Sequence, residues 1–176
     1  WRFFDKTEDH LGNHEITYSK ENGWITLNEE NSRKSYVNAS NSLLKGWQTI
    51  SGQRYYFDSM GMMETGWFQV GSSWYYADDD GVVAKGVKEI DGETYGFHTS
   101  SYYRLSGWQT INGKRFYLDT EGKAKTGLFE VSGKIYFAET VFNPETGVVK
   151  GQVAVGAKLV DGKLYVFHPS QYYRLT

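Results

Sequence analysis

Glycine followed by an aromatic or apolar residue returns about every twenty positions along this chain, each time leading a cluster of aromatic residues. The stronger starts lie at Gly46, Gly66, Gly86, Gly107 and Gly127; Gly151, which precedes Gln152, continues the series, and a fainter start lies at Gly23. Such a period is typical of a repeat architecture, in which one small unit cannot bury its apolar face alone and stacks on its neighbours. We therefore expect function to lie in the surface of the array rather than in one catalytic cleft.

The clearest copies of the repeat begin GWQTISGQRYYF at residue 46 and GWQTINGKRFYL at residue 107. In each copy, two β-prone stretches flank a two-residue turn, Ser51-Gly52 or Asn112-Gly113. Such pairs favour type I′ hairpin turns, because both central residues can take positive φ. A lone hairpin is marginal in water, and no segment has the periodicity of a helix. The sequence therefore predicts an all-β fold, a solenoid of stacked hairpin repeats of about 20 residues.

A longer period divides the chain further. Residues 87–105 match residues 157–175 at 11 of 19 positions, and each block closes a set that opens with GWQT. This period predicts degenerate repeats over 1–45, a three-hairpin set over 46–106, and a second set with an insertion over 107–176. We place about four extra residues in 139–146 and about five in 151–160. We expect one continuous solenoid, with one insertion-bearing long repeat, that is a fragment of a longer protein.

Composition and charge exclude several classes of function. The net charge is −2 with both signs interleaved, which argues against nucleic acid because phosphate binding needs a basic stripe. No apolar run approaches the length of a membrane span. The chain has no cysteine and 17% aromatic residues, so we expect most rings to fill the thin core of the solenoid.

The histidines and aspartates give no sign of catalysis or metal binding. His98 and His168 hold a repeat position where other units carry aspartate, which predicts a turn residue rather than a general base. Gly12-Asn13 separate His10 from His14 and disfavour a helical metal pair. The acidic run at 78–81 lacks the spacing of an EF-hand loop. We expect no catalytic residue, no metal and no cofactor.

The repeated pattern Gly-Trp, then Tyr-Tyr-(Phe/Ala)-Asp, then a further Gly resembles the cell-wall-binding repeat superfamily. That superfamily includes choline-binding modules, the glucan-binding repeats of glucansucrases and the receptor-binding repeats of clostridial toxins. The resemblance covers 46–138 strongly and 1–45 weakly, and it implies a β-solenoid of hairpins. Toxin arrays also contain long repeats with Tyr-Phe-Ala and a later Gly-Gln, which are similar to 136–138 and 151–152 here. That likeness implies Tyr136, Lys150 and Gln152 as oligosaccharide-binding candidates.

Choline binding would need an aromatic cage, because ring faces attract a weakly hydrated cation. In choline-binding repeats the cage joins the Trp after Gly, the Trp that opens Trp-Tyr-Tyr and a Tyr from the next unit. Only the unit at 66–85 has both tryptophans, so the resemblance implies one cage of Trp67, Trp74 and Tyr95. Such modules rely on many weak sites acting together, which makes a single cage unfavourable.

Carbohydrate binding fits more of the chain. Trp47-Gln48 with Arg54, and Trp108-Gln109 with Arg115, predict an indole beside an amide and a guanidinium on one hairpin, and so mark Trp47 and Trp108 as sugar-stacking candidates. The alternatives left open are that these tryptophans only pack between hairpins, and that the array is a rigid spacer without a soluble ligand.

The sequence thus predicts a non-catalytic module that attaches an extracellular protein of a Gram-positive bacterium, secreted or on the cell surface, to a cell-wall polymer or another glycan. Choline recognition on teichoic acid and a structural or protein-interaction solenoid are the alternatives. A separate catalytic domain could lie elsewhere in the parent protein. Exposed aromatic strips also predict a possible homodimer.

Overall fold

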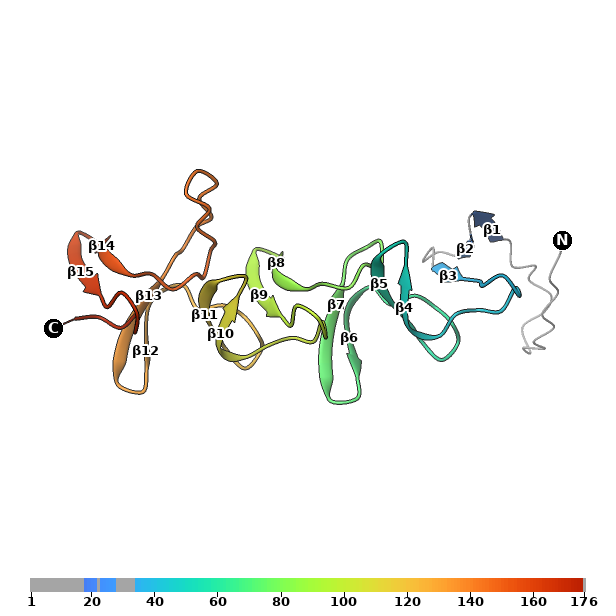
Figure 1. Ribbon diagram of the computed structural model, residues 1–176, viewed down its shortest axis with the longest axis horizontal. Coiled ribbons are helices and arrows are strands. Elements are labelled where there is room, and N and C mark those ends of the chain that lie inside the picture. The colour runs from blue at the N-terminus through green and yellow to red at the C-terminus, as the bar shows by residue number, and fades with distance from the viewer. Residues whose placement is uncertain (1–17, 22, 28–33, 176) are drawn as a thin grey trace. The chain divides into compact units, whose positions relative to one another are not determined.

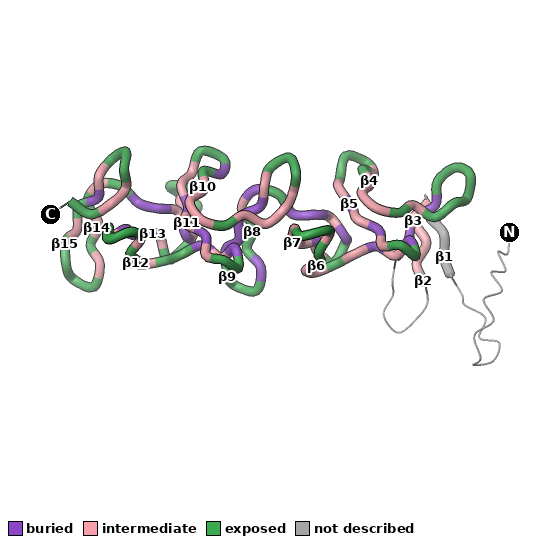
Figure 2. Tube along the Cα trace, turned by 90° about the horizontal axis from the view of Figure 1, so that it is seen from below, coloured by how far each residue is buried: buried purple, intermediate pink, exposed green. Residues whose placement is uncertain are grey.

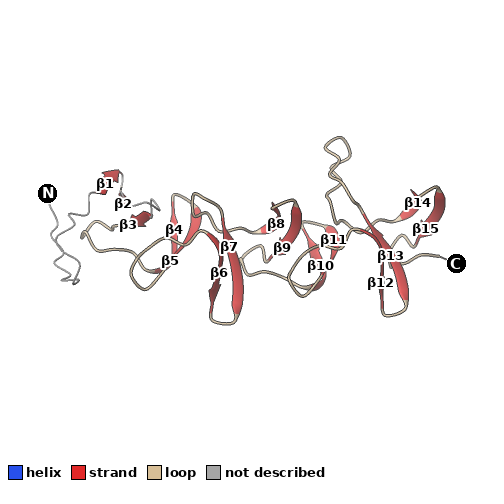
Figure 3. Ribbon diagram, turned by 180° about the vertical axis from the view of Figure 1, so that it is seen from behind, coloured by secondary structure: helices blue, strands red, loops and turns tan. Residues whose placement is uncertain are grey.

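Every strand in the described part of the chain pairs with a strand next to it in the sequence, and with no strand farther away. The computed structural model describes residues 18–21, 23–27 and 34–175, and over this part it contains strands and loops with no helix (Figure 3). The all-β prediction is confirmed.

The described strands form one three-stranded sheet, β1-β2-β3, and six two-stranded hairpins from β4-β5 to β14-β15. Their bounds are β1 Tyr18–Glu21, β2 Trp24–Leu27, β3 Lys34–Tyr36, β4 Gly46–Ile50, β5 Gln53–Phe57, β6 Gly66–Val70, β7 Ser73–Ala77, β8 Gly86–Ile90, β9 Glu93–Phe97, β10 Gly107–Ile111, β11 Lys114–Leu118, β12 Gly127–Val131, β13 Lys134–Ala138, β14 Gly156–Val160 and β15 Lys163–Phe167.

The hairpin turns take the backbone that the sequence predicts. Asn112 and Gly113 have φ of 50° and 77°, and Ser51 and Gly52 have 50° and 79°. Positive φ at both central residues is the geometry of a type I′ turn, whose twist matches that of the flanking strands.

The described chain divides into two compact units, Trp1–Glu64 and Thr65–Thr176. In the first unit, the side chains of Ser35, Val37, Phe57 and Met63 are buried, and the Trp24 ring of the three-stranded sheet lies 6.2 Å from the Phe57 ring of the β4-β5 hairpin. Backbone bonds join these parts, because Met63 donates to the Lys34 carbonyl at 2.8 Å. The set boundaries expected at residues 45 and 106 stay predictions.

In the second unit, the five hairpins from β6 to β15 follow one another (Figure 1). Their cores lie where consecutive hairpins meet: Tyr95 and Phe97 pack with Trp67, while Phe137 packs with Phe167. Figure 2 shows the buried stretches along the line of the chain and the turn tips exposed. The three inner hairpins of this unit, β8-β9, β10-β11 and β12-β13, therefore each contribute to two small cores, as expected for a repeat array.

Backbone hydrogen bonds also hold successive hairpins together. The segment that follows one hairpin donates to the second strand of the preceding hairpin. Ala124, which follows β11, donates to the Thr94 carbonyl in β9, and Val153, which follows β13, donates to the Arg115 carbonyl in β11, both at 2.8 Å. These bonds fix the spacing of side chains on adjacent hairpins, and therefore the geometry of any site between them.

The insertion of the long repeat lies in one place rather than two. Glu139 donates to the Gln152 carbonyl, as Asp119 does to that of Lys123. Twelve positions separate Glu139 from Gly151, against three between Asp119 and Gly122, so all nine extra residues fall between Glu139 and Gly151. The expected share in 151–160 is wrong.

Gly151 also does not begin a hairpin, although the sequence period places a repeat start there. It donates to the Glu139 carbonyl and closes the connection, and the next strand begins at Gly156. The period misleads because the insertion shifts every later position.

The insertion forms the long loop between β13 and β14 that projects from the second unit in Figure 1. Its end folds back over earlier hairpins. Lys150 Nζ donates to the Gly92 carbonyl at 2.5 Å, Lys114 Nζ donates to the Gly147 carbonyl, and Val149 packs against the core cluster around Phe116. The C-terminal end of the loop therefore contacts both the β8-β9 and the β10-β11 hairpins.

Candidate functional site

The register of the β10-β11 hairpin decides which side chains share its face. Trp108 pairs with Tyr117 and Thr110 pairs with Arg115, while Gln109 pairs with buried Phe116. Alternate residues of a strand point to opposite faces. Trp108, Thr110, Arg115 and Tyr117 therefore lie on one face, and Gln109 lies on the other.

Arg115 is fixed over the indole of Trp108. Its guanidinium carbon lies 5.1 Å from the ring centroid, and Nη1 donates to Thr110 Oγ1 at 3.1 Å. The threonine thus holds a cation against the ring face, an arrangement that favours cation–π attraction.

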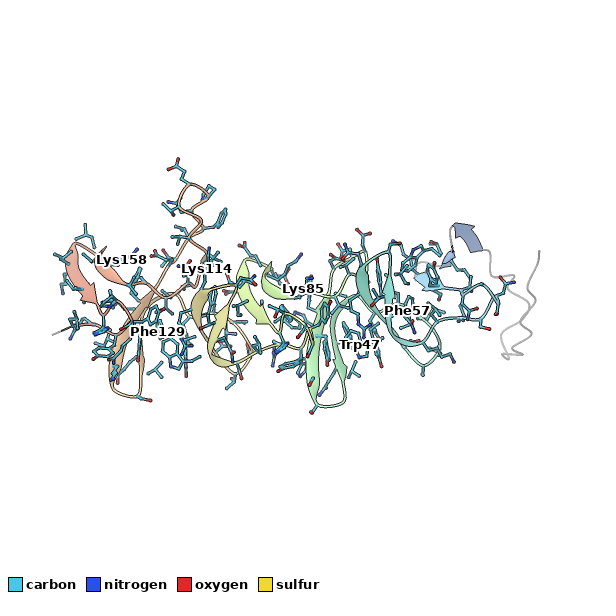
Figure 4. The ribbon with its side chains drawn as sticks, in the orientation of Figure 1. Trp47, Phe57, Lys85, Lys114, Phe129 and Lys158 are labelled. Atoms are coloured by element: carbon cyan, nitrogen blue, oxygen red, sulfur yellow. The ribbon has the colours of Figure 1, made fainter. Side chains whose placement is uncertain are left out.

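The β4-β5 hairpin repeats this arrangement in the first unit. Arg54 lies 5.2 Å from the Trp47 ring, and its Nη1 donates to Thr49 Oγ1 at 3.1 Å. Figure 4 labels Trp47 beside this hairpin. The predicted pairing of indole with guanidinium is present in both GWQT hairpins.

The predicted amide is not at either site. Gln48 Nε2 donates to the Lys45 carbonyl and Gln109 Nε2 to the Ser106 carbonyl, both at 2.7 Å. Adjacent strand residues cannot share a face, so a Gln directly after Trp points away from the indole. The expectation of an amide beside each indole is wrong.

A hollow of about 380 Å³ opens beside Trp108. The residues that line this Trp108 hollow are Trp108, Thr110, Arg115, Tyr136, Ser170, Gln171 and Tyr172. The Trp108 and Tyr136 rings meet at 4.7 Å and 61°, and Phe129, labelled in Figure 4, stacks on Tyr136 at 5.6 Å. Aromatic faces beside hydroxyl, amide and guanidinium groups can stack on a sugar ring and hydrogen-bond to its hydroxyls.

The structure also assembles the Trp67 cage, the name used here for Trp67, Trp74 and Tyr95. Trp67 meets Tyr95 of the next hairpin at 4.9 Å and 63°. Trp74 lies on the same face of its hairpin and is 40% exposed. The three side chains named as a choline cage are therefore neighbours.

A cation of the chain itself lies over this cage, which sequence reasoning missed. The guanidinium carbon of Arg104 is 5.8 Å from the Trp67 ring and 6.0 Å from the Trp74 ring. The available signal was the Tyr-Tyr-Arg-Leu that closes both repeat sets.

Sequence reasoning also undervalued Trp24 in the faint first repeat. Its ring meets Tyr36 at 5.0 Å and Tyr55 of the next hairpin at 5.2 Å and 66°. An aromatic trio thus recurs around Trp24, Trp67 and Trp108. It consists of the tryptophan, the tyrosine that pairs with it across the strands, and a tyrosine of the next hairpin.

The three candidates from the toxin-like segment are not gathered at one site. Tyr136 lines the Trp108 hollow, whereas Lys150 lines a second hollow beside Val87, Thr94 and Phe142. Gln152 accepts a hydrogen bond from the Val149 amide at 3.3 Å. Of the three, only Tyr136 lies with a sugar-stacking candidate.

The histidines of the repeat are turn residues. His98 Nδ1 lies 3.0 Å from the Ser101 amide, and His168 Nδ1 lies 3.1 Å from that of Gln171. Asp78 Oδ1 accepts from the Val82 amide at 2.9 Å in the same way. The turn prediction is confirmed for both histidines, and Asp78 holds the same position of its own repeat. His10 and His14 lie outside the described residues.

Tyr76 stands next to the Trp67 cage, with its ring 5.2 Å from that of Trp67. Burial raises the pKa of its phenol above 10.0, and the carboxylates of Asp91, Asp79 and Asp78 raise it further. Three carboxylates therefore act on a phenol that contacts Trp67.

Within the part of the chain that the structure describes, no group of three or more His, Cys, Asp or Glu side chains could hold a metal ion. No helix in that part is long and apolar enough to cross a membrane.

Comparisons with known proteins agree with this architecture. Residues 44–81 match a family model described as "Choline-binding repeat", and residues 106–124 match one described as "Putative cell wall binding repeat". No curated protein sequence matches the chain significantly.

Solved structures of choline-binding proteins resemble most of the chain. Choline binding protein F from Streptococcus pneumoniae, determined with a peptidoglycan analogue, is 26% identical with a TM-score of 0.70; the match covers 87% of this chain and 52% of that one. CbpJ from the same species is 26% identical with a TM-score of 0.65, over 98% and 54%. CbpF in complex with ipratropium is 32% identical with a TM-score of 0.64, over 82% and 43%.

The chain thus spans about half the length of the choline-binding proteins it resembles. The repeat period, the tandem hairpins, the aromatic trio, both family models and these structures point to one group. The chain belongs to the cell-wall-binding repeat superfamily.

Proposed function

We propose that this chain is a non-catalytic module that attaches a secreted or surface-located bacterial protein to cell-wall glycan through the Trp108 hollow. The proposal rests on one observation. The Trp108 and Tyr136 rings contact each other, and Thr110 holds the guanidinium of Arg115 over the Trp108 ring. The pneumococcal relative solved with a peptidoglycan analogue supports this class of ligand.

The hollow is suited to a neutral sugar rather than to a cation. Arg115 already covers the outer indole face at 5.1 Å, and its positive charge repels an ammonium group. Its remaining N–H groups, with Ser170 and Gln171 at the rim, offer donors and acceptors for sugar hydroxyls. Such sites bind weakly one at a time, so useful attachment would come from several along one array.

Retention on purified peptidoglycan and on a panel of α-glucans, followed by tryptophan fluorescence, tests the proposal. Trp108→Ala should lower retention about tenfold, the loss of one ring contact of about 1.4 kcal/mol. Gln109→Ala is the matched control, because Gln109 lies on the opposite face of the same strand. Equal retention by both variants, with the fold intact by circular dichroism, contradicts the proposal.

Choline recognition at the Trp67 cage is the second candidate. The geometry that favours it is the pair of indoles on one face with Tyr95 beside them. Arg104 lies over both indoles, so choline would have to displace its guanidinium. The relative solved with ipratropium supports a ligand of this kind. A saturable fluorescence response to choline that Trp74→Ala abolishes would favour this candidate, and a response to neither choline nor glycan would favour a spacer.

Two further expectations remain proposals. Binding as a homodimer would appear as a doubled mass in analytical ultracentrifugation. Lack of catalysis would appear as unchanged peptidoglycan after long incubation with the chain.

A further inference from the structure

The backbone places Arg104 against the Trp67 cage. The Arg104 amide donates to the Trp74 carbonyl at 2.7 Å, and Arg104 forms a bridge with buried Phe97. These contacts lock its Cα beside the second strand of the preceding hairpin. The side chain therefore starts from a fixed point next to both indoles.

Contacts on the far side hold the rest of the side chain. Arg104 Nη2 donates to the Thr120 carbonyl at 3.2 Å. The stem passes so close to Gly122 that a Cβ there would lie 2.6 Å from Arg104 Cγ. The guanidinium is thus held between two indoles and a carbonyl, and Gly122 leaves the space that the stem needs.

Arg174 occupies the same repeat position and shows what the indoles contribute. Its amide donates to the Ile135 carbonyl at 2.7 Å, as that of Arg104 does to Trp74. The preceding hairpin offers Leu128 and Ile135 instead of tryptophans, and the guanidinium lies 5.9 Å from Tyr165 of its own hairpin. Arg174 thus shares the backbone contact of Arg104, and its guanidinium lies over a tyrosine of its own hairpin rather than over indoles of the preceding one.

We propose that Arg104 is a built-in cation that occupies the Trp67 cage and sets its ligand specificity, so that a quaternary ammonium group binds only where Arg104 has left. Both cations would use the same indole faces. A tethered competitor lowers the apparent affinity by the fraction of time that it leaves the site free. If Arg104 occupies the cage about nine-tenths of the time, its removal tightens binding about tenfold. The inference deepens the second candidate function and is independent of the Trp108 hollow.

Titration of the chain with choline, followed by tryptophan fluorescence, tests this inference. Arg104→Gln should bind choline about tenfold more tightly than the unaltered chain, and adding Trp74→Ala should remove the gain. Arg174→Gln is the matched control, because it removes the same charge from the same repeat position without touching an indole; its affinity should be unchanged. An Arg104→Gln variant that folds and gains no affinity overturns the proposal.

A second measurement needs no variant. Ring currents of Trp67 and Trp74 should shift the Arg104 side-chain protons upfield in NMR spectra of the unaltered chain, and saturating choline should return them toward ordinary values. Choline that perturbs the Trp74 indole while the Arg104 signals stay still would overturn the proposal. Glycan retention, measured on the same samples, reports on the Trp108 hollow separately, so failure of one proposal is distinguishable from failure of the other.

Discussion

The aliphatic stem of Arg104 passes over Gly122 so closely that a Cβ at position 122 would lie 2.6 Å from Cγ and 2.7 Å from Cδ. Gly122 also has a φ of +79°, which L side chains avoid at a cost of about 1–2 kcal/mol. Gly122→Ala should therefore cost that strain and also push Arg104 from the cage.

Gly113→Ala separates the two effects, because Gly113 has a φ of +77° and nothing within 4 Å of its would-be Cβ. Urea unfolding should show a loss of about 1–2 kcal/mol for Gly113→Ala and a larger loss for Gly122→Ala. Choline affinity should rise only in the latter. Equal choline affinity in the two variants would contradict the role given to Gly122.

Arg115→Gln should weaken glycan retention about tenfold, because a hydrogen bond to a charged group contributes about 1.5–3 kcal/mol. Stability should change by less than about 1 kcal/mol, because the lost contact to Thr110 is exposed. Arg115→Lys keeps the charge but not the planar fork that reaches Thr110, so it should recover only part of the retention. Full recovery by lysine would show that charge alone matters at the Trp108 hollow.

The hairpins were predictable because their determinants are local. Pairs such as Asn112-Gly113 set the turn, and alternation within five residues sets the faces. The same local rule, applied strictly, excludes Gln109 from the indole face. The prediction for Gln109 is wrong because adjacent residues of a strand, such as Trp108 and Gln109, point to opposite faces.

The determinants that the sequence hides are those that cross between repeats. Arg104 reaches Trp67 from a connection that follows the next hairpin, and Lys150 reaches Gly92 across 58 positions. The nine-residue insertion also shifts the period, so Gly151 imitates a repeat start that the backbone places at Gly156. Such contacts depend on how hairpins stack, which no local pattern specifies.

Removal of residues 141–149 should leave the repeat fold in place but lower its stability. The shortened connection, Glu139-Thr140-Lys150-Gly151, has the spacing of Asp119 to Gly122. The loss of Val149 from its core cluster should cost about 1–2 kcal/mol by the transfer cost of a partly buried valine. Thermal unfolding by circular dichroism measures this loss. An unfolded product would show that the insertion is required for the array to form.

Alkaline pH should weaken the second unit through Tyr76. In the folded chain its pKa is raised above the ordinary phenol value of about 10 by burial and by Asp91, Asp79 and Asp78. Between pH 10 and that raised value, the unfolded chain has released the proton and the folded chain has kept it. Stability is therefore flat below pH 10 and falls as pH rises above it.

The urea midpoint, followed from pH 8 to pH 11.5, should fall more steeply in the unaltered chain than in Tyr76→Phe. Added salt should reduce the difference, because it screens the carboxylates. Parallel curves for the two proteins would show that Tyr76 contributes nothing to the alkaline loss.

Gly96→Ala should destabilise the stacking of β8-β9 on β10-β11, although alanine is ordinarily the better strand residue. A Cβ at position 96 would lie 2.5 Å from Leu118 Cδ1 and 2.8 Å from Ile111 Cδ1. Leu118 and Ile111 are only 1% and 3% exposed, so they have little room to move. Overpacking of this kind costs about 1–3 kcal/mol, measurable by urea unfolding.

A double variant shows whether this contact is the cause. Leu118→Val shortens the side chain that faces Gly96 and by itself should cost about 1 kcal/mol. Combined with Gly96→Ala, it should cost less than the sum of the two single changes, because the added methyl fills the space that leucine leaves. Strictly additive losses would mean that the two residues do not contact, and that the close approach of the hairpins has another origin.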